Sequence, residues 1–177
     1  MPKVYAIDGI VPVVDPGAFV HPSAVLIGDV IVGARAYIGP CACLRGDFGR
    51  IVVEEGANIQ DSCTLHGFPG KDTVAGAQAT VGHGAILHGC IVRRGALVGM
   101  NCVINDNAEV GEDAVVAALA FVKAGWKRDN MRLYQELAVR SATTMQEVQA
   151  LTRVEPGRRR IDIPGSVPLS ELKRKHG

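Results

Sequence analysis

Three histidines are the residues of this chain whose type and spacing point most directly to chemistry. His66, His83 and His88 lie close together in a 177-residue sequence that holds five histidines in total. Imidazole is the commonest metal ligand in proteins, and three histidine nitrogens with one open position form a catalytic zinc site. We therefore expect these three residues to bind zinc, with iron or cobalt as alternative metals. His21 and His176 are left outside the site.

The elements that must position these histidines come from a six-residue repeat that runs from Phe19 to Val122. The second residue of each hexad is aliphatic, a glycine, asparagine or aspartate often follows, and a small residue usually closes the unit. Hexapeptide repeats predict a parallel β-helix in which three hexads, about 18 residues, complete one coil. The register gains three residues at 49–51, pauses in FPGKD and loses one residue in VRRGA. The aliphatic positions are Val20, Leu26, Val32, Ile38, Leu44, Val53, Ile59, Leu65, Val81, Leu87, Val98, Ile104, Val110 and Val116.

The phase of each histidine in the repeat predicts how the three could meet. His66 follows the inward Leu65 and His88 follows the inward Leu87, and these leucines are one coil plus a four-residue loop apart. The two histidines should therefore lie on adjacent rungs of one side. His83 belongs to the preceding hexad and should lie around a corner. A homotrimer would bring His83 of one protomer to the other two histidines of its neighbour, so we expect metal sites between protomers.

The sequence divides into three parts. Residues 1–125 form the expected solenoid, and residues 126–154 carry apolar side chains at helical spacing, which predicts a helix packed along it. Residues 155–177 mix proline, glycine and basic residues, so we expect an extended, solvated basic tail.

Composition excludes several classes of partner. The 19 Lys and Arg residues nearly balance the 18 Asp and Glu residues, so no overall field attracts nucleic acid or an acidic membrane. No apolar run is long enough to span a bilayer, and the first ten residues lack the features of a secretion signal. We expect a cytoplasmic protein with a small-molecule substrate.

Upstream of the histidines, the motifs Arg-x-Asp and Asn-x-Gln-Asp resemble those of the γ-class carbonic anhydrase superfamily. They are formed by Arg45 with Asp47, and by Asn58 with Gln60 and Asp61. A closer resemblance, through FVHPSAVLIGDVIVG, LRGDFGRIVVEEGANIQD and GHGAILHGC, is to the branch that holds the phenylacetic-acid-degradation protein PaaY and its carnitine-pathway relative CaiE.

The resemblance implies a left-handed winding and a role for each motif residue. Gln60 would hydrogen-bond a metal-bound water, Asn58 would support it, and Tyr134 would face the site. Ion pairs of Arg45 with Asp61 or Asp47 would join the protomers. The branch also normally has a further coil and the start of the helix where this chain runs from Gly125 directly into Trp126.

A metal-bound hydroxide is the nucleophile that this site implies, since zinc lowers the pKa of its bound water to about 7. We expect a zinc-dependent acyl-CoA thioesterase of phenylacetate degradation, with Phe48, Phe68 and Tyr134 as an apolar wall. The alternatives are a carbonic anhydrase acting on CO₂ or bicarbonate, and a non-catalytic accessory protein stabilised by metal. Phe48 and the stretch 67–69 replace the acidic proton shuttles of the family, which predicts slow CO₂ hydration. An acyltransferase is disfavoured, because hexapeptide acyltransferases typically use one catalytic histidine without such a metal site.

Overall fold

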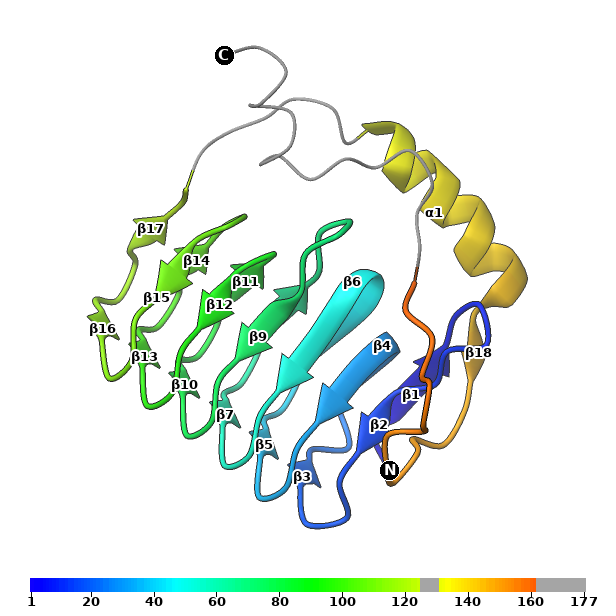
Figure 1. Cartoon of the computed structure of the whole chain (residues 1–177), viewed down its shortest axis with the longest axis horizontal. Coiled ribbons are helices and arrows are strands. Elements are labelled where there is room, and N and C mark those ends of the chain that lie inside the picture. The colour runs from blue at the N-terminus through cyan, green and yellow to red at the C-terminus, as the bar shows by residue number, and fades with distance from the viewer. Residues whose placement is uncertain (125–130, 162–177) are drawn as a thin grey trace.

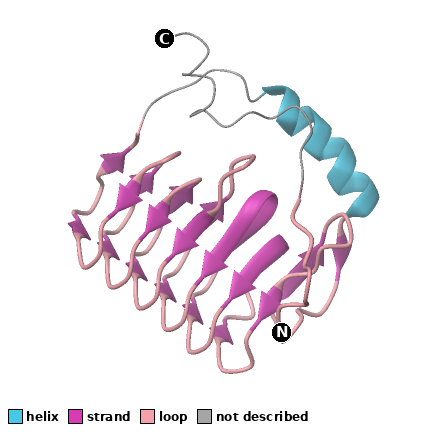
Figure 2. Cartoon of the chain, in the orientation of Figure 1, coloured by secondary structure: helices cyan, strands magenta, loops and turns pink. Residues whose placement is uncertain are grey.

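The chain folds into a left-handed parallel β-helix with one short helix near its C-terminal end (Figures 1 and 2). This computed structural model describes residues 1–124 and 131–161. The expected fold class is confirmed. Each coil has three sides, here called faces 1, 2 and 3, and the coils stack from the blue N-terminal end of Figure 1 to β17.

Strands of successive coils pair in parallel along each face. Face 1 holds β1 (Lys3–Ala6), the first part of β4 (Val25–Val32) and of β6 (Cys43–Val53), β8 (Thr64–His66), β11 (Ile86–His88), β14 (Val103–Ile104) and β17 (Phe121–Val122). Face 2 holds β2 (Val13–Val14), the second part of β4 and of β6, β9 (Thr73–Ala75), β12 (Ile91–Val92) and β15 (Glu109–Val110). Face 3 holds β3 (Phe19–Val20), β5 (Tyr37–Ile38), β7 (Asn58–Ile59), β10 (Thr80–Val81), β13 (Leu97–Val98) and β16 (Val115–Val116).

The core consists of stacked columns of aliphatic side chains, one behind each face. Fully buried members include Leu26, Leu44, Leu65, Leu87, Ile104, Val53, Val92, Ile38, Ile59, Val81 and Val98. Each such burial contributes about 1.5–3 kcal/mol. Alanine or cysteine fills the tighter positions between columns, as at Ala42, Cys63 and Ala85, which are also fully buried. The repeat alone therefore specifies the core.

Strand pairing confirms the expected register and its irregularities. Val25 pairs with Cys43 across one regular coil of three hexads. Cys43 pairs with Thr64, and Thr64 with Ile86, across coils that the inserted segments lengthen. Ile86 pairs with Val103 across the coil that VRRGA shortens. The inserted and deleted residues are thus absorbed without disturbing the inward columns.

Two of the three edges of the prism are regular. At the edges between faces 2 and 3 and between faces 3 and 1, here called the regular edges, one residue of each turn from Arg35 onward adopts a left-handed conformation. These residues are Arg35, Gly56, Gln78, Gly95 and Asp113 on one edge, and Cys41, Ser62, Gly84, Asn101 and Leu119 on the other. Their backbone N–H groups donate to the turn of the preceding coil, for example Gly84 to Asp61 and Asn101 to His83, both at 2.9 Å.

The third edge, between faces 1 and 2, also has left-handed residues, at Gly28, Gly89 and Asn107, but inserted segments lengthen it in the middle coils. It comprises residues 8–9, 28–29, 46–50, 67–72, 89 and 106–107 and is here called the polar edge. Both extended insertions lie on it. A Cβ atom at Gly67 would come within 2.4 Å of the Gly49 backbone, so these two segments pack main chain against main chain. Glycine is required there by space rather than by an unusual φ.

Helix α1 (Met131–Thr144) packs across the N-terminal part of the polar edge. Leu137 joins a small apolar cluster with Ile7 and Phe48. Arg140 donates to the carbonyl oxygen of Asp47 and lies over the Phe48 ring. The helix therefore covers the residues that follow the Arg-x-Asp motif.

The helix ends at Thr144, although the helical spacing in the sequence continues further. β18 (Gln146–Glu147) pairs antiparallel with β1, and the Val148 N–H donates to the Val4 carbonyl at 2.6 Å. This segment adds an edge to the first coil, because the first coil leaves its backbone groups unpaired at the end of the solenoid.

The beginning of the expected tail returns to the polar edge. Arg158 is 5% exposed at its side chain and pairs at 3.0 Å with the buried Asp29, which also pairs with Arg50 at 3.0 Å. Arg159 donates to the Asp8 carbonyl, and Arg160 pairs with Asp72. The expectation of a solvated tail is therefore wrong for Arg158, because a buried carboxylate needs cationic partners.

The junction of Gly125 and Trp126 lies outside the described residues. No helix within 1–124 and 131–161 has the length and apolar character needed to cross a bilayer.

Candidate functional site

His66 and His88 are direct neighbours on face 1. They are paired residues of β8 and β11, and their ring centroids lie 4.9 Å apart. The expected placement on adjacent rungs is confirmed. Both strands end at these histidines, so the side chains lie where face 1 meets the polar edge.

His66 belongs to a buried ionic chain. Its Nε2 lies 2.9 Å from Asp47 Oδ1, and Arg45 donates to the other carboxylate oxygen, Oδ2, at 3.1 Å. A carboxylate only accepts hydrogen bonds, so neutral His66 carries its proton on Nε2. Burial lowers the pKa of His66, and this outweighs the opposing hydrogen bond to Asp47. Burial would raise the pKa of Asp47, but the His66 hydrogen bond and the Arg45 charge outweigh it and hold that pKa below its usual range.

His88 is the more accessible histidine of the two. Its side chain is 23% exposed, and its Nδ1 lies 2.5 Å from Asp106 Oδ1. Because Asp106 accepts the Nδ1 proton, the lone pair of neutral His88 lies on Nε2. Nε2 has no hydrogen-bond partner within the described part of the chain. This is the arrangement of a general base oriented by a carboxylate.

His83 lies at a regular edge, away from the other two histidines of its own chain. Its side chain is 53% exposed, with Nδ1 3.5 Å from Asp61 Oδ2. Gln60 Oε1 accepts a hydrogen bond from the His83 backbone N–H at 3.1 Å, so Gln60 is tied to this turn. Asn58 lies on β7 of face 3, paired with Tyr37 and Thr80.

The remaining predicted site residues lie in three places. Arg45 and Asp47 pair with each other within one chain, so an ion pair that joins protomers stays a prediction. The Phe48 ring lies 5.3 Å from that of His66, and the Phe68 ring 6.2 Å from that of His88. These two phenylalanines do line the histidine pair. Tyr134 lies on α1, and its side chain falls outside the described part of the structure.

The side chains of one chain do not complete a metal site. Among residues 1–124 and 131–161, no group of three or more histidine, cysteine, aspartate or glutamate side chains is placed to hold an ion. His66 and His88 fit as two of three ligands, because each has a carboxylate on one ring nitrogen that fixes the tautomer. A third ligand would have to come from another protomer.

Asp106 is a functional candidate that the sequence reasoning missed. It lies 18 residues after His88, one place beyond the residue that the shortened coil brings into register with His88, so a search for acidic residues about one coil from each histidine could have found it. Arg140 and Arg158 carry no such signal, because they follow the end of the repeat.

Curated relatives are similar over most of the chain. It is 51% identical to the carnitine operon protein CaiE of Salmonella agona, covering 89% of this chain and 92% of that protein. It is 48% identical to the carnitine operon protein CaiE of a Proteus species, covering 90% and 94%. The alignment with the Salmonella protein spans 183 positions but includes only about 158 residues of this chain. About 25 residues of the relative therefore have no counterpart here. No protein-family model matches the chain.

Among solved structures, a Bacillus cereus protein assigned as an acetyltransferase is similar, with a TM-score of 0.58 and 25% identity over 78% of this chain and 91% of that protein.

These findings correct the expected function. The thioesterase, carbonic anhydrase and phenylacetate assignments, and with them the classes hydrolase and lyase, are wrong: the relatives carry the name of a carnitine operon protein, and the solved neighbour is assigned as a transferase. Acyl transfer with one catalytic histidine, which the sequence disfavoured, must therefore be considered at His88.

Proposed function

The chain belongs to the CaiE family of carnitine operon proteins, and from that premise we propose that it is an acyltransferase of carnitine metabolism with His88 as the general base. The family membership rests on about 50% identity over nearly the full length of both chains. The similarity to CaiE noted in the sequence is thereby confirmed, whereas the link to PaaY and the carbonic anhydrases is not.

The observation that carries the proposal is the His88–Asp106 pair. His88 is partly exposed and its Nε2 is available, while Asp106 holds the ring by Nδ1 at 2.5 Å. His66 is a poorer base, because it is buried and its Nε2 proton is held by Asp47. The structural neighbour from Bacillus cereus that is assigned as an acetyltransferase supports the reaction class.

The chemistry uses one proton relay. A hydroxyl or amine group of the acceptor attacks the carbonyl carbon of an acyl thioester, and its proton passes to His88 Nε2. The carbon–sulfur bond then breaks, the acyl group stays on the acceptor, and His88 returns the proton to the thiolate. Asp106 stabilises the imidazolium that forms between these steps. Phe48 and Phe68 offer apolar contacts beside the two histidines.

We also propose that the protein is a homotrimer and that the site lies between protomers. Hexapeptide β-helix proteins are typically trimers, and the outward residues of face 1 near the site include the half-exposed Ile86. Association would bring the exposed His83 of one protomer toward His66 and His88 of the next. A cytoplasmic location stays a prediction.

The test is release of coenzyme A from acetyl-CoA by the purified protein, with and without carnitine as acceptor. We expect release that depends on the acceptor, and His88→Ala and Asp106→Asn should lower kcat by about 10²–10⁴-fold. His21→Ala, at a half-buried histidine of a regular edge, is the matched control and should keep full activity. Release at equal rates without any acceptor would indicate hydrolysis and overturn the proposal. If no coenzyme A is released with any hydroxyl or amine acceptor, the acyltransferase proposal is wrong and a non-enzymatic role in the operon is favoured.

A shared metal ion remains a separate proposal for the same histidines. Zinc, iron or cobalt bound by His66, His88 and His83 of a neighbour would occupy the His88 lone pair and exclude its role as a base. Metal analysis of the purified trimer separates the two. One ion per protomer that is lost in both His88→Ala and His83→Ala would assign the histidines to metal binding, and a metal-free active protein would assign His88 to the base.

A further inference from the structure

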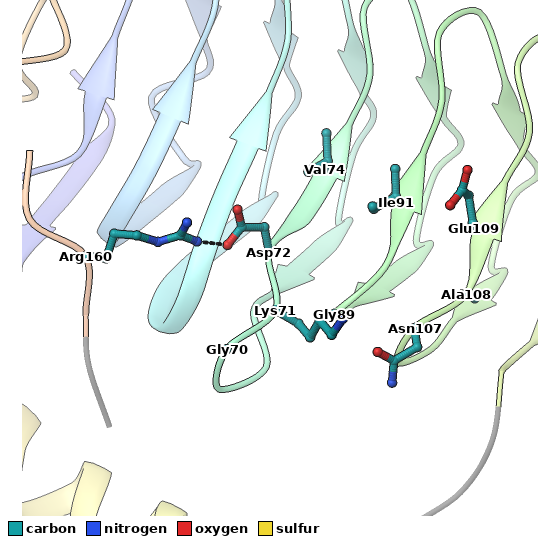
Figure 3. Close-up of a pocket in the computed structure, with 10 residues that line it drawn as sticks. All are labelled: Gly70, Lys71, Asp72, Val74, Gly89, Ile91, Asn107, Ala108, Glu109 and Arg160. Atoms are coloured by element: carbon teal, nitrogen blue, oxygen red, sulfur yellow. Dashed lines mark hydrogen bonds and ion pairs between the residues drawn. The ribbon is translucent and has the colours of Figure 1, made fainter. Parts of the chain in front are cut away.

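A cavity of about 390 Å³ lies on face 2, against the polar edge (Figure 3). Its rim is the loop 70–72, and Gly89 and Asn107 close it toward face 1. These two residues directly follow His88 and Asp106 in the chain. The volume is at the lower end for pockets that hold small organic ligands.

The acidic groups of this cavity are already neutralised. Asp72 pairs with Arg160, which arrives from the C-terminal segment, as the dashed line in Figure 3 shows. Glu109 pairs with Arg93 at 2.7 Å. Neither carboxylate is therefore available to attract a cationic ligand.

Lys71 supplies a cation without a counter-charge. Its side chain extends from the loop toward Gly89, and its ammonium makes no ion pair or hydrogen bond with the described residues. The Asn107 side chain lies at the same end of the cavity and offers an amide N–H. The polar end of the cavity can therefore bind one singly charged group with oxygen acceptors.

The opposite wall is apolar. Val74 and Ile91 are paired residues on adjacent strands of face 2, both half-buried, and Ala108 is buried beside them. A multiply charged phosphate would leave this wall unused and would exceed the single cation. A ligand with one carboxylate and a short aliphatic body matches both ends.

We propose that this cavity binds a small aliphatic carboxylate, with the carboxylate on the Lys71 ammonium and the Asn107 amide, and the aliphatic body against Val74 and Ile91. The site stands on its own cavity and does not depend on acyl transfer at His88.

The experiment is isothermal titration of the full-length protein with butyrate as the probe, beside n-butanol and inorganic phosphate. We expect saturable butyrate binding in the millimolar range or tighter, and no measurable binding of n-butanol. Lys71→Met should weaken butyrate binding about tenfold or more, since a hydrogen bond to a charged group is lost. Lys71→Arg should retain most of it, and Lys3→Met, at an exposed lysine of β1, should change nothing.

Three results would overturn the proposal: no butyrate binding, phosphate bound as well as or better than butyrate, or unchanged butyrate affinity in Lys71→Met. Thermal unfolding of each variant confirms that it is folded. Butyrate binding that persists in His88→Ala separates this site from the acyltransfer proposal, because either can then fail alone.

Discussion

The polar edge and the two regular edges of the prism differ in how the chain turns from one face to the next. At the regular edges, each coil turns through one left-handed residue whose N–H donates to the coil before it. At the polar edge, only Gly89 and Asn107 keep this backbone pattern, the chain adds residues at 46–50 and 67–72, and charged side chains make further contacts between coils. Asp29, Asp47 and Asp106 all lie there.

The difference shows where this solenoid has room for chemistry. The regular edges repeat one turn, whereas at the polar edge carboxylates contact histidines and arginines of other coils. The pairs Asp47–His66 and Asp106–His88 each join neighbouring coils across the polar edge. The following variants test this contrast, from the largest expected effect to the smallest.

The buried charge at the polar edge should be the most sensitive point. Asp29→Asn leaves Arg50 and Arg158 without their carboxylate, and removing one partner of a buried pair costs about 3–5 kcal/mol. Urea unfolding measures the loss. Glu109→Gln, which breaks the exposed pair with Arg93, should change stability little. Equal effects of the two substitutions would mean that the buried charges do not stabilise the polar edge.

The inward columns should respond strongly to truncation. Leu87→Ala empties a fully buried position, and we expect a loss of about 2–5 kcal/mol. Leu97→Ala makes the same change at a side chain that is 41% exposed on face 3, so the expected loss is about 0.5 kcal/mol. Chemical denaturation of both variants provides the measurement, and a similar loss at the two leucines would contradict the assigned register.

Close backbone packing should distinguish glycines of the two kinds of edge. Gly67→Ala places a methyl group within 2.4 Å of the Gly49 backbone and should cost about 1–3 kcal/mol. Gly111→Ala, at a regular edge, meets no atom within 4 Å and should be neutral or slightly stabilising. Melting temperatures of the pair check the prediction, which fails if Gly67→Ala is tolerated as well as its counterpart.

Alkaline pH should weaken the fold through a buried thiol. Burial raises the pKa of Cys63, so the folded protein keeps a proton that the unfolded chain loses above its pKa of about 8.5. The contribution of Cys63 to the free energy of unfolding is therefore fully present below that pH. It declines as the pH rises toward the pKa that Cys63 has in the folded protein, by up to about 1.4 kcal/mol per pH unit. Cys63→Ala should make the decline shallower, while Cys41→Ala, at an exposed thiol, should leave it unchanged. Unfolding curves from pH 8 to 10 measure both slopes, and identical slopes would refute the assignment.

Sequence by itself determined the solenoid, its inward columns and the neighbourhood of His66 and His88. It could do so because each hexad dictates its own strand and turn, and coil stacking then follows from counting residues. The extra residues near Gly49 and the loop after Gly67 were also visible, since they interrupt the count.

Only the tertiary structure decided which charges meet. The return of Arg158 to Asp29 joins residues 129 positions apart, and no repeat connects them. The burial of His66 beneath Asp47 and the cavity at Lys71 depend on how the inserted segments fold over neighbouring coils. Such contacts follow from side-chain packing at an irregular edge, which residue spacing along the chain does not encode.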